Sequence, residues 1–149
     1  MKFLKRLFVR KEKFPRLLLR PSVNHYFINI ARIVATRGTC SKIQVGCVLI
    51  NKRKHILSTG YNGVASGQPH CKGSKNSIGS NTGTCEAIHA EQNALLQCSN
   101  VYDIYSCYTT LSPCLTCVKL LLNTSCLLIF FHEKHPSSEA AKKLWTSAG

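Results

Sequence analysis

The spacing of hydrophobic positions along the chain predicts alternating helical and extended elements. Apolar residues after Ser22 recur at helical spacing, with Ser22 as N-cap and Gly38 placed to end the helix. Two apolar runs, Val45–Ile50 and Ile56–Thr59, flank the basic turn 51–54 and predict a β-hairpin. The apolar positions of the first helix are Val23, Tyr26, Phe27, Ile30 and Val34.

The later part of the chain alternates helices with strands. The expected helices are Cys85–Gln97, Pro113–Leu122 and Ser138–Ser147, and the expected strands are Ile104–Thr109 and Ser125–Phe131. Pro113 stands at a first helical position and Ser137 at an N-cap. Strands separated by helices favour parallel pairing after the antiparallel hairpin. The pattern therefore predicts an α/β fold in three layers, with a mixed sheet and helices on both faces.

The length of the chain and its net charge limit the kinds of partner that the protein can have. The 149 residues suit one domain, and the net charge is +14. Residues 1–20 carry eight Lys and Arg against Glu12 alone, so they form a basic extension, predicted to be a partly disordered tail. Weak membrane, nucleic-acid or organellar targeting by this extension is the alternative. The rest of the chain is also basic, and a basic protein suits an anionic partner such as a nucleotide, a nucleic acid or a membrane surface.

The apolar stretches and the cysteines of the chain indicate its cellular compartment. Apolar stretches such as Leu127–Phe131 are too short to span a bilayer, and basic residues interrupt any signal-peptide pattern near the start. We therefore expect a soluble, cytoplasmic protein. Nine cysteines in such a protein favour metal binding over disulfides. Three of them fall in strand-like apolar runs and are expected to be buried thiols, namely Cys47, Cys107 and Cys126.

Two motifs suggest a catalytic metal centre. His89-Ala90-Glu91 lies in one predicted helix, and Pro113-Cys114-Leu115-Thr116-Cys117 opens the next. Cys114 and Cys117 are three residues apart, so both sulfurs share one helical face, where the helix N-terminus favours thiolates. His89 with these two sulfurs makes three zinc ligands and leaves a fourth position for water.

Glu91 distinguishes a catalytic zinc from a structural one. It stands two residues from His89, close enough to take a proton from that water without binding the ion. A lone Cys-x-x-Cys would equally suit a redox pair, and a purely structural zinc would leave Glu91 without a role. The two motifs together match the signature of zinc nucleobase deaminases.

Further motifs make the chain resemble the deoxycytidylate (dCMP) deaminase family, especially its short bacterial branch associated with late-competence operons. The resemblance runs from about Arg20 to Gly149. Besides the zinc motifs, it is carried by Arg20-Pro21-Ser22, Thr39-Cys40, Val45-Gly46, Gly60-Tyr61-Asn62-Gly63, Ser66-Gly67-Gln68-Pro69-His70-Cys71, Cys85, Gln92-Asn93-Ala94 and Thr110-Leu111-Ser112. Residues 21–149 are thereby expected to form the catalytic domain.

The resemblance implies a fold and an activity. The fold would be a three-layer α-β-α cytidine deaminase-like arrangement with a five-stranded mixed sheet, commonly assembled into homo-hexamers. The family continues past the last helix into another strand, and the sequence stops at Gly149, so that edge strand is expected to be missing. The reaction would be zinc-dependent hydrolysis of dCMP to dUMP and ammonia, supplying thymidylate synthesis. dCTP and dTTP would be effectors, sought at the glycine-rich loop 60–84.

The resemblance also implies roles for single residues. His89, Cys114 and Cys117 would hold zinc, with Glu91 as proton shuttle. Substrate contacts would come from backbone groups of Ala90 and Ser112, from Asn62 at the sugar and from His135, which replaces a stacking tyrosine. A turn residue at Asn62 and an exposed histidine before Pro136 are the plainer alternatives. The resemblance also implies a second, structural zinc at Cys40, Cys71 and Cys85, which are otherwise reduced loop thiols. The family's fourth ligand is a histidine that Thr82 replaces here, and His70, next to Cys71, is the candidate for that position.

Some features leave other functions open. The phosphate-binding residue is not evident, and the candidates are Lys42, Lys72 and Lys75. A tRNA adenosine deaminase would share the zinc site and suit the basic charge, but Ser112 and Thr116 depart from that family's motif. Deamination of free cytosine or cytidine is a weaker rival. A rival from another class is a non-catalytic, zinc-stabilised nucleic-acid-binding protein linked to DNA uptake.

Overall fold

The computed structural model describes residues 20–40, 42–70 and 87–148. In these residues the elements are α1 (Val23–Ala35), β1 (Gly46–Ile50), β2 (Ile56–Tyr61), α2 (Ala90–Gln97), a short 3-10 helix (Val101–Asp103), β3 (Ser106–Leu111), α3 (Leu115–Leu122), β4 (Leu128–Glu133) and α4 (Ser138–Ser147). The predicted order of helices and strands is confirmed. None of the helices described is long and apolar enough to cross a membrane.

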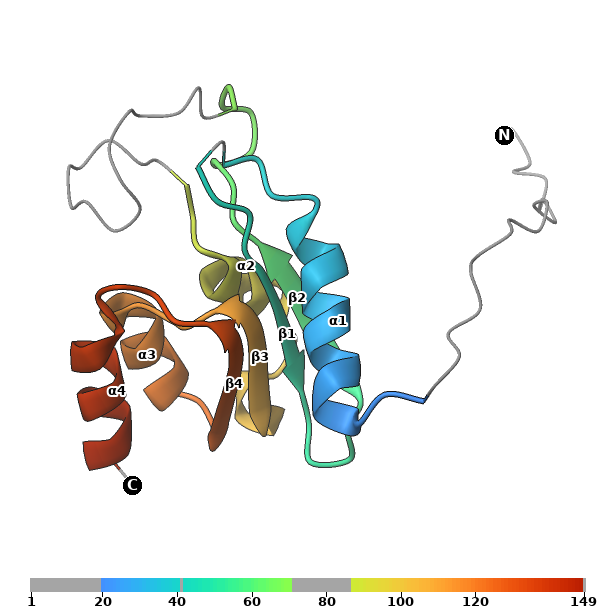
Figure 1. Ribbon diagram of the computed structural model, residues 1–149, viewed down its shortest axis with the longest axis vertical. Helices are drawn as coiled ribbons and strands as arrows, with labels where there is room; N and C mark the ends of the chain where they lie inside the picture. Colours follow the sequence, from blue (N-terminus) through green and yellow to red (C-terminus); the bar gives the residue numbers. More distant parts are fainter. Residues whose placement is uncertain (1–19, 41, 71–86, 149) are drawn as a thin grey trace, which may run out of the picture.

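The strands form one mixed sheet in the order β2-β1-β3-β4 (Figure 1). β1 pairs antiparallel with both β2 and β3, whereas β3 and β4 are parallel. The tight turn 51–54 allows the antiparallel hairpin, and α3 supplies the crossover that parallel strands need. The mixed sheet expected from the sequence is therefore confirmed, with four strands in the described part of the chain.

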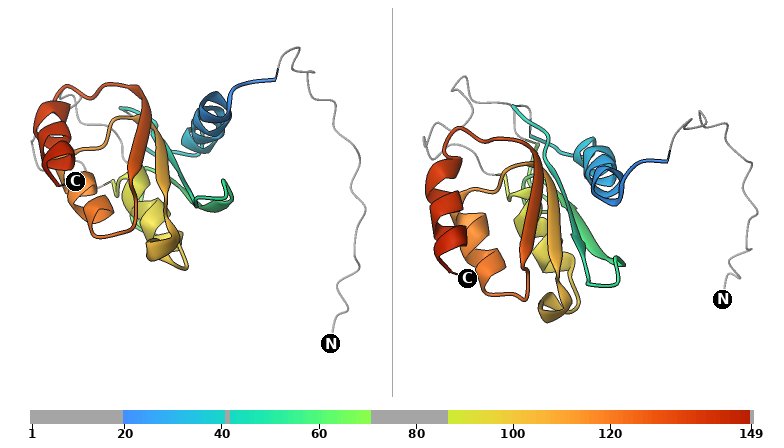
Figure 2. Two further views of the ribbon diagram at one scale, coloured as in Figure 1. Left: turned by 90° about the horizontal axis from the view of Figure 1, so that it is seen from below. Right: turned by 60° about the horizontal axis from the view of Figure 1, so that its bottom comes forward.

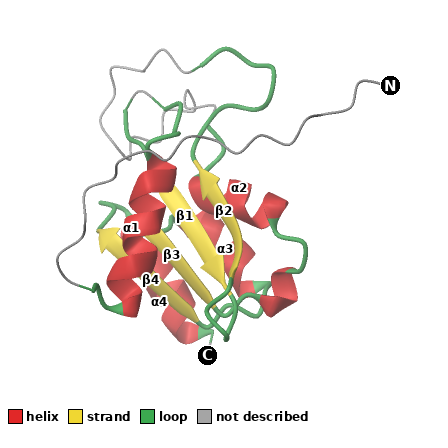
Figure 3. Ribbon diagram, turned by 90° about the vertical axis from the view of Figure 1, so that its right-hand side faces the viewer, coloured by secondary structure: helices red, strands yellow, loops and turns green. Residues whose placement is uncertain are grey.

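The sheet has one helix on one face and three on the other. In Figure 3, α1 crosses the near face, while α2, α3 and α4 lie behind the strands, and Figure 2 shows the same two helical layers. Two glycines let helices approach the sheet backbone closely. A Cβ at Gly46 would lie 2.0 Å from the Ala31 carbonyl oxygen of α1, and one at Gly60 would lie 2.2 Å from the Ala90 carbonyl oxygen of α2.

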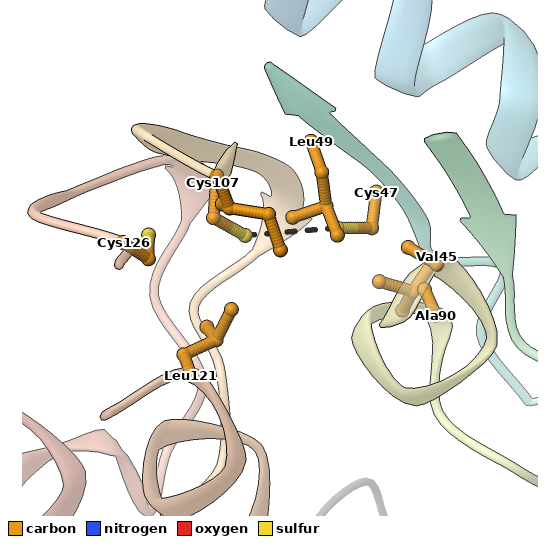
Figure 4. Close-up of a cluster of buried hydrophobic side chains, with 9 residues drawn as sticks. Val45, Cys47, Leu49, Ala90, Cys107, Leu121 and Cys126 are labelled. Carbon is orange, nitrogen blue, oxygen red and sulfur yellow. Dashed lines mark hydrogen bonds between the residues drawn. The ribbon is translucent and has the colours of Figure 1, made fainter. Parts of the chain in front are cut away.

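The core beneath α2 and α3 contains the cysteines expected to be buried. Cys47 and Cys107 are completely buried, and their sulfur atoms are 3.6 Å apart (Figure 4). The hydrogen bond to Cys47 and burial raise the pKa of the Cys107 thiol well above its usual range. Burial raises the pKa of Cys126 to about 12. These thiols therefore stay protonated and serve as small apolar core groups.

Several predicted boundaries were wrong. α2 begins at Ala90 rather than Cys85, because Ile88 still pairs as extended backbone with Gly63. α3 begins at Leu115, because Cys114 is its N-cap with an extended ψ of 170°. The predicted strands Ile104–Thr109 and Ser125–Phe131 are displaced, and the observed ones are Ser106–Leu111 and Leu128–Glu133.

The first helix also presents a different face to the sheet. Ser22 is its N-cap as predicted and accepts a hydrogen bond from the His25 N–H at 3.3 Å. The predicted apolar stripe, however, is only partly buried, because Val23 and Tyr26 are exposed. Of that stripe Phe27 is buried, and it is joined by Ile28 and by the small residues Ala31 and Ala35. The helix ends at Ala35, before Gly38, with Thr36 as C-cap.

Candidate active site

The candidate site lies where the N-termini of α2 and α3 meet. His89 is the N-cap of α2, and Cys114 is the N-cap of α3. Cys117 follows in the first turn of α3 and is completely buried. Residues far apart in sequence are thus brought together because each caps or opens a helix at the same end of the sheet.

The three predicted metal ligands converge on one point. The Nδ1 atom of His89 is 3.4 Å from Sγ of Cys114 and 3.4 Å from Sγ of Cys117. All three ligand atoms lie within 4.8 Å of one another. Usual zinc–sulfur and zinc–nitrogen bond lengths at a tetrahedral angle separate sulfur from nitrogen by about 3.5 Å. The donor set and its spacing therefore fit a zinc ion with one open position.

Electrostatics favour a thiolate in this cluster. Hydrogen bonds from Cys117 and His89 lower the pKa of Cys114 to about 3. The complementary hydrogen bond to Cys114 raises the pKa of Cys117, and the same neighbour raises the pKa of His89. Cys114 is therefore the thiolate of the pair, and the thiolate is the form of cysteine that binds metal.

Glu91 is the buried carboxyl group of the site. It lies in the first turn of α2 and is only 4% exposed. Burial raises its pKa, with His89 and the backbone opposing that shift. A buried carboxyl group two positions from a candidate metal ligand can take up and release a proton at a molecule bound there.

Ser112 and His135 are also brought together. The His135 backbone N–H donates to Ser112 Oγ at 2.8 Å, and the Ser112 N–H donates to the Glu133 carbonyl at 2.8 Å. The Ser137 N–H donates to Nδ1 of His135 at 3.1 Å, and this contact leaves the proton of a neutral ring on Nε2. The Ser137 hydroxyl pairs with the same nitrogen and makes no side-chain cap to α4.

Asn62 plays a structural part in the described chain. Its side-chain oxygen accepts from the Val45 N–H at 2.8 Å, and its amide donates to the Ile43 carbonyl at 2.8 Å. One amide hydrogen and one oxygen lone pair remain for another partner, so the sugar contact stays a prediction. Ala90 is fully buried at the start of α2, beside the candidate metal ligands.

The second cysteine set is only partly within the described residues. Cys40 is buried at 6% exposure, and His70 is exposed. Cys71 and Cys85 lie outside the described residues, as do Lys72 and Lys75. Lys42 is half-buried. The second zinc and the phosphate contact stay predictions.

One contributing residue was missed by the sequence reasoning. Gln92 accepts a hydrogen bond from the His89 backbone N–H at 2.8 Å and so fixes the start of α2. The spacing of Gln92 three residues after the N-cap is that of a capping box, which was the available signal. Asn93 has a similar structural role, because its amide donates to the Tyr61 carbonyl at 2.8 Å.

Comparisons with known proteins agree with this geometry. A sequence model described as the cytidine and deoxycytidylate deaminase zinc-binding region matches residues 21–133. The chain is 32% identical over 149 residues to a deoxycytidylate deaminase of Saccharomyces cerevisiae, covering 93% of this chain and 46% of the yeast protein. It is 31% identical over 133 residues to ComE operon protein 2 of Bacillus subtilis, covering 87% of this chain and 69% of that protein.

The fold is shared with a solved structure. A dCMP deaminase of the cyanophage S-TIM5, crystallised in complex with dCMP and dUMP, superposes with a TM-score of 0.72 at 21% identity. The match covers 88% of this chain and 95% of the phage protein. A second yeast relative is a deoxycytidylate deaminase of Schizosaccharomyces pombe, 32% identical over 139 residues. The chain spans less than half the length of these two yeast relatives, at 46% and 43% of their sequences.

Proposed function

Since this chain belongs to the cytidine and deoxycytidylate deaminase family, we propose that it hydrolyses dCMP to dUMP and ammonia with a zinc cofactor. The observation that supports this proposal most directly is the buried Glu91 carboxyl beside three converging candidate ligand atoms. The names of the yeast relatives and the nucleotides bound to the phage protein support dCMP as substrate. The product would supply thymidylate synthesis.

The residues divide the chemistry between them. Held by His89, Cys114 and Cys117, zinc would lower the pKa of a water molecule and so provide a nucleophile near neutral pH. Glu91 accepts the proton of the water that attacks C4 of the cytosine ring. It passes this proton to N3 and then moves the second proton of the former water, from the oxygen now bonded to C4, to the departing amine, so that a C–O bond replaces a C–N bond and ammonia leaves.

The walls of the site would orient the ring. Backbone groups of Ala90 and Ser112 would read the pyrimidine edge, and Asn62 would contact the sugar. His135 would stack on the base, and its contacts to Ser112 and Ser137 support a fixed ring orientation.

Ammonia release from the full, zinc-loaded chain tests this proposal. The substrates are dCMP, deoxycytidine, dCTP and an anticodon stem-loop RNA, compared at equal concentration. We expect turnover of dCMP above the other three. Turnover of the RNA alone would instead assign the chain to tRNA adenosine deamination and overturn the proposed substrate.

A pair of matched variants tests the role of Glu91. Glu91→Gln should lower kcat on dCMP by about 10²–10⁴-fold, the usual contribution of general acid–base catalysis, while zinc content stays unchanged. Glu133→Gln makes the same change at an exposed carboxyl on β4 and should leave kcat unaltered. Equal activity of the wild type and Glu91→Gln would refute the mechanism. Zinc binding without turnover of any substrate would favour the non-catalytic rival.

The second zinc and the assembly are parts of the same proposal. Two zinc ions per chain, falling to one in Cys40→Ser, would support the second site. A self-associated state is supported by an apolar groove of about 400 Å³ between α2 and α3, lined by Ile88, Gln92, Leu95, Leu96 and Leu120. Sedimentation velocity measures that state, and a monomer at assay concentration would contradict it.

Regulation and location complete the proposal. A polar cavity of about 320 Å³ includes Thr39, Tyr61, Ser66, Gln68 and Asn93, and it supports an effector site for dCTP or dTTP. Rates measured with each nucleotide test it, and rates independent of both would contradict it. A zinc centre built from two cysteines suits a reducing compartment, which supports a cytoplasmic location.

A further inference from the structure

The outer face of α1 is an apolar surface that the described chain leaves uncovered. Val23, Tyr26 and Ile33 are 43%, 49% and 70% exposed, and half-buried Ile30 lies between them. These four positions are spaced three or four residues apart, so they form one stripe along the helix. We call this stripe the α1 surface. Figure 3 shows α1 alone on its side of the sheet, with its outer side turned away from the strands.

The charge around the α1 surface is mainly positive, and the described carboxylate near it is Glu133 of β4, whose partner His132 contacts Arg32. Arg20 and Arg37 flank the helix, and Arg32 is exposed on it. Residues 13–85 contain no Asp or Glu at all, and this stretch includes α1, β1 and β2. Residues 1–20, which lead into α1, add eight Lys and Arg against Glu12. The uncovered apolar stripe is therefore embedded in a strongly basic region.

The hairpin turn adds to this charge at one end of the sheet. Lys52, Arg53 and Lys54 are all exposed. β1 begins at Gly46, against the C-terminal part of α1, and runs toward the beginning of the helix, so the turn lies at the same end as Arg20. The described carboxylate beside the turn is Asp103, which accepts a hydrogen bond from Asn51.

We propose that the α1 surface and the described basic residues around it bind an anionic lipid bilayer surface. A lipid interface accepts both kinds of group, because apolar side chains enter the acyl boundary while Lys and Arg contact lipid phosphates. Nucleic acid would neutralise the charges but leave the aliphatic side chains Val23, Ile30 and Ile33 without a partner. A second copy of this surface would be repelled by its like charge.

The candidate active site stays open in this arrangement. The zinc ligands lie at the starts of α2 and α3, on the face of the sheet opposite α1. They also lie at the carboxyl end of β3, whereas the basic turn lies beside the amino end of that strand, where Ser106 pairs with Ile50. Lipid binding through α1 therefore leaves access to the site, and it does not depend on which substrate the site takes.

Vesicle co-sedimentation of the full chain tests the proposal. The probes are vesicles of phosphatidylcholine alone and vesicles with phosphatidylglycerol at about one lipid in three. We expect binding to the anionic vesicles only, falling about tenfold or more between low salt and 0.5 M salt as charges are screened. Absence of binding to anionic vesicles at low salt, whether or not the chain binds RNA, would overturn the proposal.

Matched variants locate the surface. Val23→Glu with Ile33→Glu should weaken binding by about tenfold or more, because two side chains lose their apolar burial. Thr146→Glu places the same charge at an exposed residue of α4, on the opposite face of the sheet, and should bind like the wild type. Lys52→Gln with Arg53→Gln should weaken binding by about thirtyfold, from the usual contribution of each charge near a lipid surface. Unchanged binding of the α1 variant, with an unaltered circular dichroism spectrum, would refute a role for α1.

Discussion

The close approach of α2 to β2 makes Gly60→Ala an informative substitution. An added Cβ would lie 2.2 Å from the Ala90 carbonyl oxygen and 2.3 Å from the Ala94 amide nitrogen. Both atoms belong to the helix backbone, so no side-chain rotation relieves the overlap. Helix α2 has to move away from the sheet by more than an ångström to restore ordinary contact.

The size of the effect follows from this geometry. Overpacking a rigid core costs about 1–3 kcal/mol of the free energy of unfolding, and contacts with backbone atoms place Gly60→Ala near the upper limit. A loss of about 3 kcal/mol lowers the midpoint of thermal unfolding by roughly 10 °C for a domain of this size. The displacement also carries His89 and Glu91, at the start of α2, away from Cys114 and Cys117. Zinc affinity and turnover should therefore fall together with stability.

Gly46→Ala provides the matched comparison. Its Cβ would lie 2.0 Å from the Ala31 carbonyl oxygen of α1, which is an equally severe overlap on the other face of the sheet. Urea unfolding should show similar losses for both variants, measured on zinc-loaded protein. Zinc content and dCMP turnover per folded molecule should fall only for Gly60→Ala. A stability change of Gly60→Ala within about 0.5 kcal/mol of zero, or equal loss of turnover in both variants, would refute the reasoning.

Three further substitutions or modifications test the core. Leu49→Ala removes a completely buried side chain and should cost about 2–5 kcal/mol in urea unfolding, and a smaller loss would mean that the core closes over the cavity. Tyr108→Phe removes the hydrogen bond from the hydroxyl to Asn24 Oδ1 at 2.9 Å and should cost about 1 kcal/mol, measured in the same way. Maleimide should label half-exposed Cys98 in the native state but Cys107 only after unfolding, as read by peptide mass analysis, and native labelling of Cys107 would contradict its burial.

The order of elements was predictable because each has a clear local signal. The apolar runs on either side of the turn 51–54 and the cap at Ser22 are properties of short segments, and the hairpin and the cap are both confirmed. The start of α2 was not predictable in this way. Ile88 is held extended by pairing with Gly63, a contact between residues 25 positions apart that helical periodicity does not register.

The metal ligands were predictable because they combine a specific spacing with a specific chemistry. His89, Cys114 and Cys117 converge as expected, although His89 is the N-cap and not within a helical turn. The face of α1 was harder to predict, since hydrophobic pattern ranks Val23 and Tyr26 above alanine. The sheet instead selects Ala31 and Ala35, because only small side chains fit where α1 approaches Gly46.

The direction of β4 explains how the far end of the chain reaches the candidate site. β3 and β4 are parallel, so their carboxyl ends lie side by side, and the residues that follow each strand meet there. Ser112 follows β3 and receives the hydrogen bond from His135, which follows β4. Had β4 returned antiparallel through a short turn, His135 would lie at the opposite end of the sheet. The crossover helix α3 therefore does two things: it presents Cys114 and Cys117, and it allows the strand direction that delivers His135 to the same place.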